Sequence, residues 1–169
     1  MPEEKPNNTY WTIHFDGSRY LEGSGAGVVL TSPRGDNFCY VLRLMFPCTN
    51  NTTEYEALLH GLRVAKDMSL SRVRCIGDSD LVAQQVSGKW DSKDPLMAAY
   101  HREVGVVAGH FKGYQVEHID RRKNEADDAL SRLGSQHKLV PPNTVLDVLH
   151  NPSVKLPTEE DLVVPNPEE

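Results

Sequence analysis

The hydrophobic pattern of this chain changes its period partway along, and this change limits the folds that it can adopt. At first, apolar residues alternate with polar ones or form short runs, which is typical of strands. These runs cover residues 10–16, 25–30 and 37–46, and two turn signals, Gly17–Ser18 and Pro33–Asp36, join them. Three consecutive strands with short connections predict an antiparallel meander.

After the meander, apolar residues recur at steps of three and four, as they do on one face of a helix. The first such helix is expected around residues 55–65, with Asn51, Thr52 or Thr53 as its N-cap. The elements expected beyond it are a strand, two helices, a strand and a helix, at residues 72–77, 79–87, 95–111, 113–119 and 124–133. Strands and helices in this order indicate an α/β domain.

The two ends of the chain differ in composition from its body. Residues 139–169 hold six of the eleven prolines, and six acids against one base, Lys155. We expect a disordered leader at 1–9, one domain at 10–138, and a Pro-rich acidic tail or polyprotein linker at 139–169. Within the tail, the run 145–150 is compatible with a turn of helix. The acidic residues at the two ends account for the whole net charge of −6, so the body between them is neutral. A neutral body with local basic patches can bind a phosphate backbone, so the net charge does not exclude nucleic acid as a partner.

Nothing in the sequence indicates export or a membrane anchor. There is no run of about 18 apolar residues, and the polar N-terminus lacks the apolar centre of a secretory signal. Three cysteines without a CxxC spacing are not typical of a disulfide scaffold or a zinc site. We therefore expect an intracellular protein, cytoplasmic or nuclear, that does not bind membranes.

Acidic residues stand where predicted strands end and where predicted helices begin. Asp16 ends the first strand, Glu54 begins the first helix, and Asp78 follows the fourth strand. Asp127 and Asp128 lie near the start of the last helix. Each acid alone is more often a cap or a loop residue than a catalytic group, so the case for function depends on their sequence contexts taken together.

These contexts are DGS at 16–18, TNNTTEYEAL at 49–58, GDSDLV at 77–82 and NEADDAL at 124–130. In this order and spacing they resemble type 1 ribonuclease H, over about residues 10–135. The resemblance implies an α/β, ribonuclease H-like fold: a five-stranded mixed sheet, with three antiparallel strands followed by two parallel ones, flanked by helices. The chain looks closest to the compact version of archaea, some bacteria and plant retroelements. Its VLDVLHNPSV segment resembles the sequence that follows this domain in plant gypsy-type polyproteins.

The resemblance also implies a set of catalytic residues. The family's carboxylates fall on four positions: Asp16, Glu54, Asp78 and Asp128. The family pattern N-x-x-A-D-x-L, with Asn124 and Leu130 in place, selects Asp128 over Asp127 for the last of them. The family's mobile histidine falls on His118, for which a surface histidine at a strand end is the alternative interpretation.

Converging carboxylates suit the hydrolysis of a phosphodiester. Two Mg²⁺ ions about 3.5–4 Å apart can activate a water molecule and stabilise the leaving oxygen, and Mg²⁺ prefers carboxylate and water oxygens as ligands. Without metal, four carboxylates repel one another, so at least one of them should have a raised pKa. We expect the four acids to hold two Mg²⁺ ions, with Mn²⁺ able to substitute, and His118 to assist product release or proton transfer.

The resemblance implies a substrate-binding set as well: Gly17, Ser18, Thr49, Asn50, Asn51, Arg121 and Arg122. Asn50 and Asn51 match residues that contact the minor groove and the 2′-hydroxyl, which distinguishes RNA from DNA. Thr49 matches a contact to a DNA phosphate, and the backbone of the DGS motif would approach the RNA strand. Arg121 and Arg122 begin a basic loop that either contacts phosphates or is simply solvated.

Three functions remain in contention. The first is an endoribonuclease that cuts the RNA strand of RNA/DNA hybrids and leaves 5′-phosphate and 3′-hydroxyl ends. It would be monomeric in isolation and one segment of a retrotransposon polyprotein, beside reverse transcriptase and integrase. The alternative is a weak or inactive hybrid-binding module, which Asp80 favours because the family often has Gln there. A transposase or integrase relative fits less well, because Glu54 and the NEADDAL motif are ribonuclease features.

Overall fold

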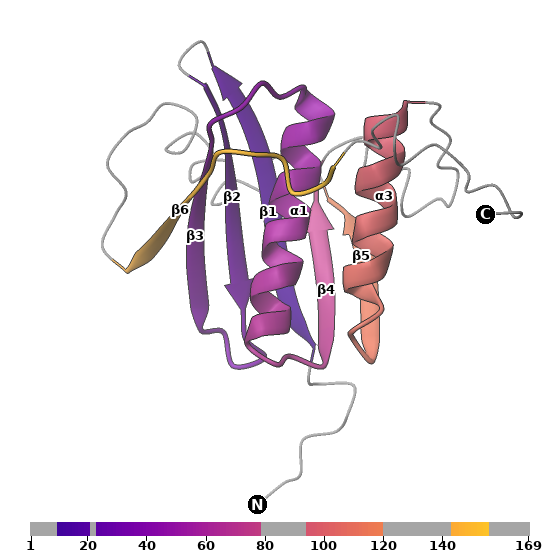
Figure 1. The fold of residues 1–169 in the computed structure, drawn as a ribbon. Helices are drawn as coiled ribbons and strands as arrows, with labels where there is room; N and C mark the ends of the chain where they lie inside the picture. The colour runs from indigo at the N-terminus through magenta and orange to yellow at the C-terminus, as the bar shows by residue number, and fades with distance from the viewer. Residues whose placement is uncertain (1–9, 21–22, 79–93, 120–142, 156–169) are drawn as a thin grey trace, which may run out of the picture.

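The computed structural model describes residues 10–20, 23–78, 94–119 and 143–155 of the 169-residue chain. Within these ranges, six strands form one sheet in the order β5-β4-β1-β2-β3-β6, and two helices, α1 and α3, cover one of its faces (Figure 1). This is the α/β mixed sheet that the sequence predicted, with six strands where five were expected. The helices predicted at 79–87 and 124–133 lie outside the described residues.

The first three strands form the expected meander. They are β1 (Trp11–Tyr20), β2 (Gly23–Thr31) and β3 (Asn37–Leu44), and both pairings are antiparallel. The turn before β3 contains Gly35 at φ 96°, a left-handed conformation that glycine adopts without strain.

The turn predicted at Gly17–Ser18 is wrong, because β1 continues through both residues. Gly17 pairs with Ala26, and Ser18 pairs with Gly25. The glycine has a different use: a Cβ atom at Gly17 would lie 2.6 Å from Cγ2 of Thr53 in the first helix. Its missing side chain therefore lets a helix approach the strand, and the chain does not reverse there.

The two helices begin at side-chain caps. Helix α1 (Asn50–Asp67) is capped by Thr49, two to four residues earlier than the caps expected from the sequence. Helix α3 (Pro95–Ala108) is capped by Asp94, whose Oδ1 accepts a hydrogen bond of 2.9 Å from the Leu96 backbone N–H. Proline at the first turn suits a helix start, because no hydrogen bond to its nitrogen is needed there.

The helices connect strands that run parallel to one another. Strand β4 (Arg72–Gly77) follows α1 and pairs with β1, and β5 (Gly113–His118) follows α3 and pairs with β4. Both pairings are parallel, as predicted. The C-terminal ends of these parallel strands consequently meet at the same edge of the sheet.

The sixth strand lies in the segment that the sequence assigned to the tail. Strand β6 (Thr144–Leu149) pairs in parallel with β3, from Thr144 opposite Cys39 to Leu149 opposite Leu44. The turn of helix considered for residues 145–150 is therefore wrong. A partner 100 residues away in the chain decides the conformation of this short apolar run, which has no decisive period of its own.

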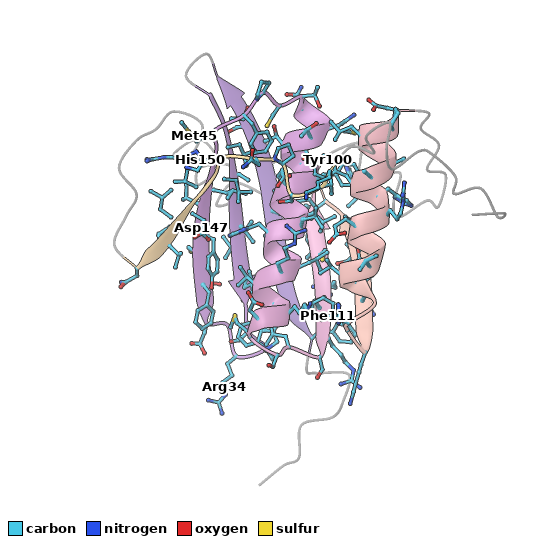
Figure 2. All side chains as sticks on the ribbon, in the orientation of Figure 1. Arg34, Met45, Tyr100, Phe111, Asp147 and His150 are labelled. Carbon is cyan, nitrogen blue, oxygen red and sulfur yellow. The ribbon has the colours of Figure 1, made fainter. Side chains whose placement is uncertain are left out.

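The main hydrophobic core lies between the sheet and the two helices. Its large buried members include Ile13, Phe15, Tyr55 and Tyr100. Figure 2 labels Tyr100, which belongs to α3, and Phe111, which follows that helix and lies lower in the view. A smaller cluster of Val29 and Val41 lies apart from this core. Among the described residues, neither helix has the length and apolar character needed to cross a membrane.

Candidate active site

Two of the candidate carboxylates lie at the same edge of the sheet. Asp16 belongs to β1, and Asp78 directly follows β4, the neighbouring parallel strand. In this register His14 pairs with Ile76, so each acid stands two residues beyond a paired position. Asp16 is buried, with 6% of its surface exposed, and Asp78 is half-buried. The parallel pairing of β1 with β4 is thus what brings the two acids together.

The third carboxylate comes from the first turns of α1. The cap at Thr49 accepts a hydrogen bond of 3.1 Å from the Thr52 backbone N–H, and its carbonyl accepts one of 2.8 Å from the Thr53 hydroxyl. Glu54 follows and is buried, with 8% exposed. The Gly17 backbone N–H donates a hydrogen bond of 3.1 Å to its Oε1. The close contact between Gly17 and Thr53 therefore places the Glu54 carboxyl group against β1, next to Asp16.

The electrostatics show that the three acids act on one another. The pKa of Glu54 is raised from 4.5 to about 9, first by burial and next by the negative charge of Asp16. A hydrogen bond with the Asp16 side chain and the charge of Asp78 raise it further, while the Gly17 N–H opposes the shift. The metal-free site thus keeps Glu54 protonated at neutral pH, as expected for converging carboxylates.

His118 completes the group from the neighbouring strand. It is the last residue of β5, it is exposed, and its Nε2 lies 3.2 Å from the backbone carbonyl oxygen of Asp78. The Ile119 N–H donates a hydrogen bond of 3.0 Å to the Gly77 carbonyl, which keeps the ends of β4 and β5 together. The imidazole of His118 therefore lies beside the backbone at the end of β4.

The structure therefore places four of the five predicted catalytic residues at one edge of the sheet: Asp16, Glu54, Asp78 and His118. The fifth, Asp128, lies outside the described residues. The predicted substrate-binding residues flank the same place. Gly17 and Ser18 continue β1 beyond Asp16, while Thr49, Asn50 and Asn51 form the exposed start of α1. Arg121 and Arg122 lie outside the described part of the chain.

The donor set suits a divalent cation in its chemistry. Carboxylate oxygens are the ligands that Mg²⁺ prefers, and Oε2 of Glu54 is buried with no hydrogen-bond partner. Within the ranges that the structure describes, no group of three or more His, Cys, Asp or Glu side chains is close enough to hold a metal ion. The predicted set also includes Asp128, which those ranges do not contain.

Sequence reasoning missed one buried acid beside the site. Glu56, two residues after Glu54, has 0% of its surface exposed, and its Oε1 accepts a hydrogen bond of 2.6 Å from the Tyr100 hydroxyl. The available signal was its helical position, because Glu56 shares a face of α1 with Thr52 and Leu59, which are both buried.

Comparisons with known proteins agree with this geometry. A family model described as reverse transcriptase-like matches residues 14–134. Ribonuclease HI of Halobacterium salinarum is 34% identical over 120 residues, which are 70% of this chain and 60% of that protein. The uncharacterized protein YpeP of Bacillus subtilis is 29% identical over 148 residues, 80% of this chain and 63% of that protein. The chain thus spans about three fifths of the length of these two curated relatives.

Solved structures show the same fold. The crystal structure of RNase H1 from Halobacterium salinarum superposes with a TM-score of 0.67 at 28% identity, covering 76% of this chain and 98% of that one. LC11-RNase H1 in complex with an RNA/DNA hybrid gives a TM-score of 0.64 at 24% identity, covering 75% and 97%. The second likeness concerns the fold alone.

Proposed function

Because this chain belongs to the reverse transcriptase-like family and has the fold of the ribonucleases H, we propose that it is a metal-dependent endoribonuclease that hydrolyses the RNA strand of RNA/DNA hybrids. The observation that carries the proposal is the position of Asp16, Glu54 and Asp78 at one edge of the sheet, where burial first and then the neighbouring carboxylates raise the pKa of Glu54 to about 9. Carboxyl groups whose pKa is shifted this far by burial and by neighbouring charges are concentrated at functional sites. The hybrid in the related LC11-RNase H1 complex supports the choice of substrate.

In this proposal Asp16, Glu54, Asp78 and Asp128 would hold two Mg²⁺ ions, for which Mn²⁺ would substitute. The burial of Glu54 beside the charges of Asp16 and Asp78 supports this assignment, because a bound cation would favour the ionised form of these carboxyl groups. When bound, the ions would supply an activated water and stabilise the leaving oxygen. Water would then add to the phosphorus as the bond to the 3′-oxygen breaks, leaving a 5′-phosphate.

The remaining groups would place the hybrid and move the proton. Nε2 of His118, beside Asp78, would assist transfer of a proton to the leaving 3′-oxygen or release of the product. Asn50 and Asn51 would contact 2′-hydroxyls in the minor groove, where RNA differs from DNA. Thr49 at the helix start would receive a phosphate of the DNA strand, and the backbone at Gly17 and Ser18 would face the RNA.

The wider setting is part of the same proposal. The protein would act inside the cell as one segment of a retrotransposon polyprotein, beside reverse transcriptase and integrase segments, and it would be a monomer in isolation. Arg121 and Arg122 would contact phosphates. The alternative, a catalytically weak hybrid-binding module of the same fold, shares every one of these contacts and differs only in turnover.

A cleavage assay separates the two functions. A hybrid labelled on either strand is incubated with the protein in Mg²⁺, Mn²⁺ or EDTA, beside an Asp78→Asn variant. Asp67→Asn, at the exposed end of α1, serves as a matched control. We expect cutting of the RNA strand only, dependent on metal, abolished by Asp78→Asn and retained by Asp67→Asn. Binding of the hybrid without cutting in either metal would instead favour the hybrid-binding module, and cutting of both strands would contradict the ribonuclease H assignment.

A further inference from the structure

The segment after the family domain is built into the fold. Residues 144–155, here called the C-terminal strap, follow the region that matches the family, which ends at residue 134. The strap begins as β6 beside β3, where the Met45 N–H donates a hydrogen bond of 2.7 Å to the Leu149 carbonyl. It then crosses in front of α1 toward α3 (Figure 1).

Where the strap reaches α1, it satisfies the buried Glu56 carboxylate. The Ser153 backbone N–H donates a hydrogen bond of 2.8 Å to Oε1, and the Ser153 hydroxyl donates one of 2.6 Å to Oε2. The Tyr100 hydroxyl of α3 supplies the third hydrogen bond. Burying a carboxylate is costly unless its oxygens are paired, so two of the three bonds that hold Glu56 come from one residue of the strap.

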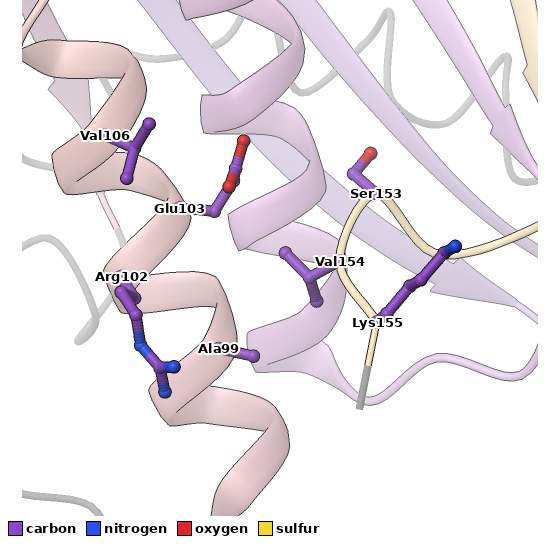
Figure 3. A pocket seen from close by; sticks show the side chains of 7 residues that line it. All are labelled: Ala99, Arg102, Glu103, Val106, Ser153, Val154 and Lys155. Carbon is purple, nitrogen blue, oxygen red and sulfur yellow. The ribbon is translucent and has the colours of Figure 1, made fainter. Parts of the chain in front are cut away.

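Two further contacts fix the strap between the same elements. Nη2 of Arg63 lies 3.2 Å from Oε1 of Glu103 in α3 and 3.3 Å from the Ser153 carbonyl oxygen. At the other end of the strap, Nε2 of His60 lies 3.0 Å from Oδ2 of Asp147. Beyond Ser153 the strap and α3 border an open pocket of about 250 Å³ (Figure 3). The strap therefore links β3, α1 and α3.

These contacts act on the helix that carries Glu54. Glu54 and Glu56 are separated by about 200° around the helix axis, so α1 is held on one side through Gly17 and on the other through Ser153. The space at Gly17 is tight, since even a Cβ there would lie 2.6 Å from Thr53. A helix held from two sides by hydrogen bonds has little freedom to move the Glu54 carboxyl group away from Asp16.

We propose that Ser153 is a positioning residue, which holds α1 through Glu56 and so sets the place of Glu54 against Gly17 and Asp16. The part of the inference that concerns cleavage rests on the proposed function. Ser153 itself touches neither substrate nor the reacting groups. Its effect passes through one buried carboxylate and about half a turn of helix.

The test compares Ser153→Ala, Ser153→Thr and the control Lys155→Ala in the full 169-residue chain. Ser153→Ala removes the hydroxyl and keeps the backbone N–H bond to Glu56, so we expect the variant to fold. We expect kcat to fall about tenfold with KM changed less than about twofold, because a small misplacement of a catalytic group mainly affects the chemical step. Ser153→Thr keeps a hydroxyl and should restore kcat, and Lys155→Ala, exposed in the same strap, should resemble the wild type.

A second readout does not depend on cleavage. The amide resonance of Gly17 reports its hydrogen bond to Glu54, and we expect Ser153→Ala to shift it in NMR spectra while Lys155→Ala does not. A shifted resonance in a protein that never cuts a hybrid would support the strap and contradict the proposed function. A lower melting temperature with unchanged kcat and an unchanged Gly17 resonance would overturn the inference. If Ser153→Ala does not fold, Arg63→Gln, which removes the contact to the Ser153 carbonyl, tests the same resonance.

Discussion

At the scale of single residues, Glu54 couples the stability of the site to pH. Its pKa is raised from 4.5 in the unfolded chain to about 9 in the folded, metal-free protein, so folding takes up a proton between these pH values. The stability that this group contributes is fully present below pH 4.5 and is lost as the pH rises toward 9. We expect the free energy of unfolding in EDTA to fall from pH 5.5 through 7 to 8.5.

Urea unfolding of Glu54→Gln tests this assignment, because glutamine cannot ionise. The variant should lose most of the pH dependence, and Asp67→Asn should keep it. A divalent cation should also restore stability to the wild type at high pH, since a bound cation favours the ionised form of Glu54. Equal pH slopes for the wild type and Glu54→Gln would show that another group is responsible.

At the scale of secondary-structure elements, the distance between β1 and α1 depends on the absence of a side chain at Gly17. In Gly17→Ala, the new Cβ would meet Thr53 at 2.6 Å and push the helix from the strand, which breaks the bond from Gly17 to Glu54. We expect a loss of about 1–3 kcal/mol in the free energy of unfolding, measured by urea denaturation, together with a loss of cleavage.

Another glycine provides the matched control. A Cβ at Gly105, inside α3, would meet nothing within 4 Å, so Gly105→Ala should stabilise the protein by about 0.5–1 kcal/mol through its helix propensity. If Gly17→Ala and Gly105→Ala changed the free energy of unfolding in the same direction, the close approach of Thr53 would not explain the need for glycine at position 17.

The elements also show what the sequence can and cannot predict. Strands β1 to β5 and both helices were predicted because each has a clear hydrophobic period, and Asp16, Glu54 and Asp78 were selected as candidates through the motifs around them. The turn at Gly17–Ser18 was predicted from local turn chemistry, whereas the glycine is required by a helix 36 residues later. The same limit explains β6 and the bonds from Ser153 to Glu56, which join residues about 100 positions apart and leave no local period.

At the scale of the whole molecule, the body and the C-terminal end of the chain differ in net charge. The net charge is −6, and residues 156–169 hold five acids and no base: Glu159, Glu160, Asp161, Glu168 and Glu169. A chain ending at Lys155 keeps the strap and has a net charge of −1. Because a hybrid is a polyanion, we expect the shorter chain to bind it several-fold more tightly at about 50 mM salt.

The measurement uses Asp78→Asn in both lengths, so that the hybrid is not cut during titration. At about 0.5 M salt, where charges are screened over a few ångströms, the two lengths should bind equally. Replacing the five acids by their amides in the full-length chain should reproduce the effect of truncation if charge alone is responsible. A tighter complex for the truncated chain that persists at high salt, or that the amide variant lacks, would mean that residues 156–169 oppose binding by occupying space rather than by charge.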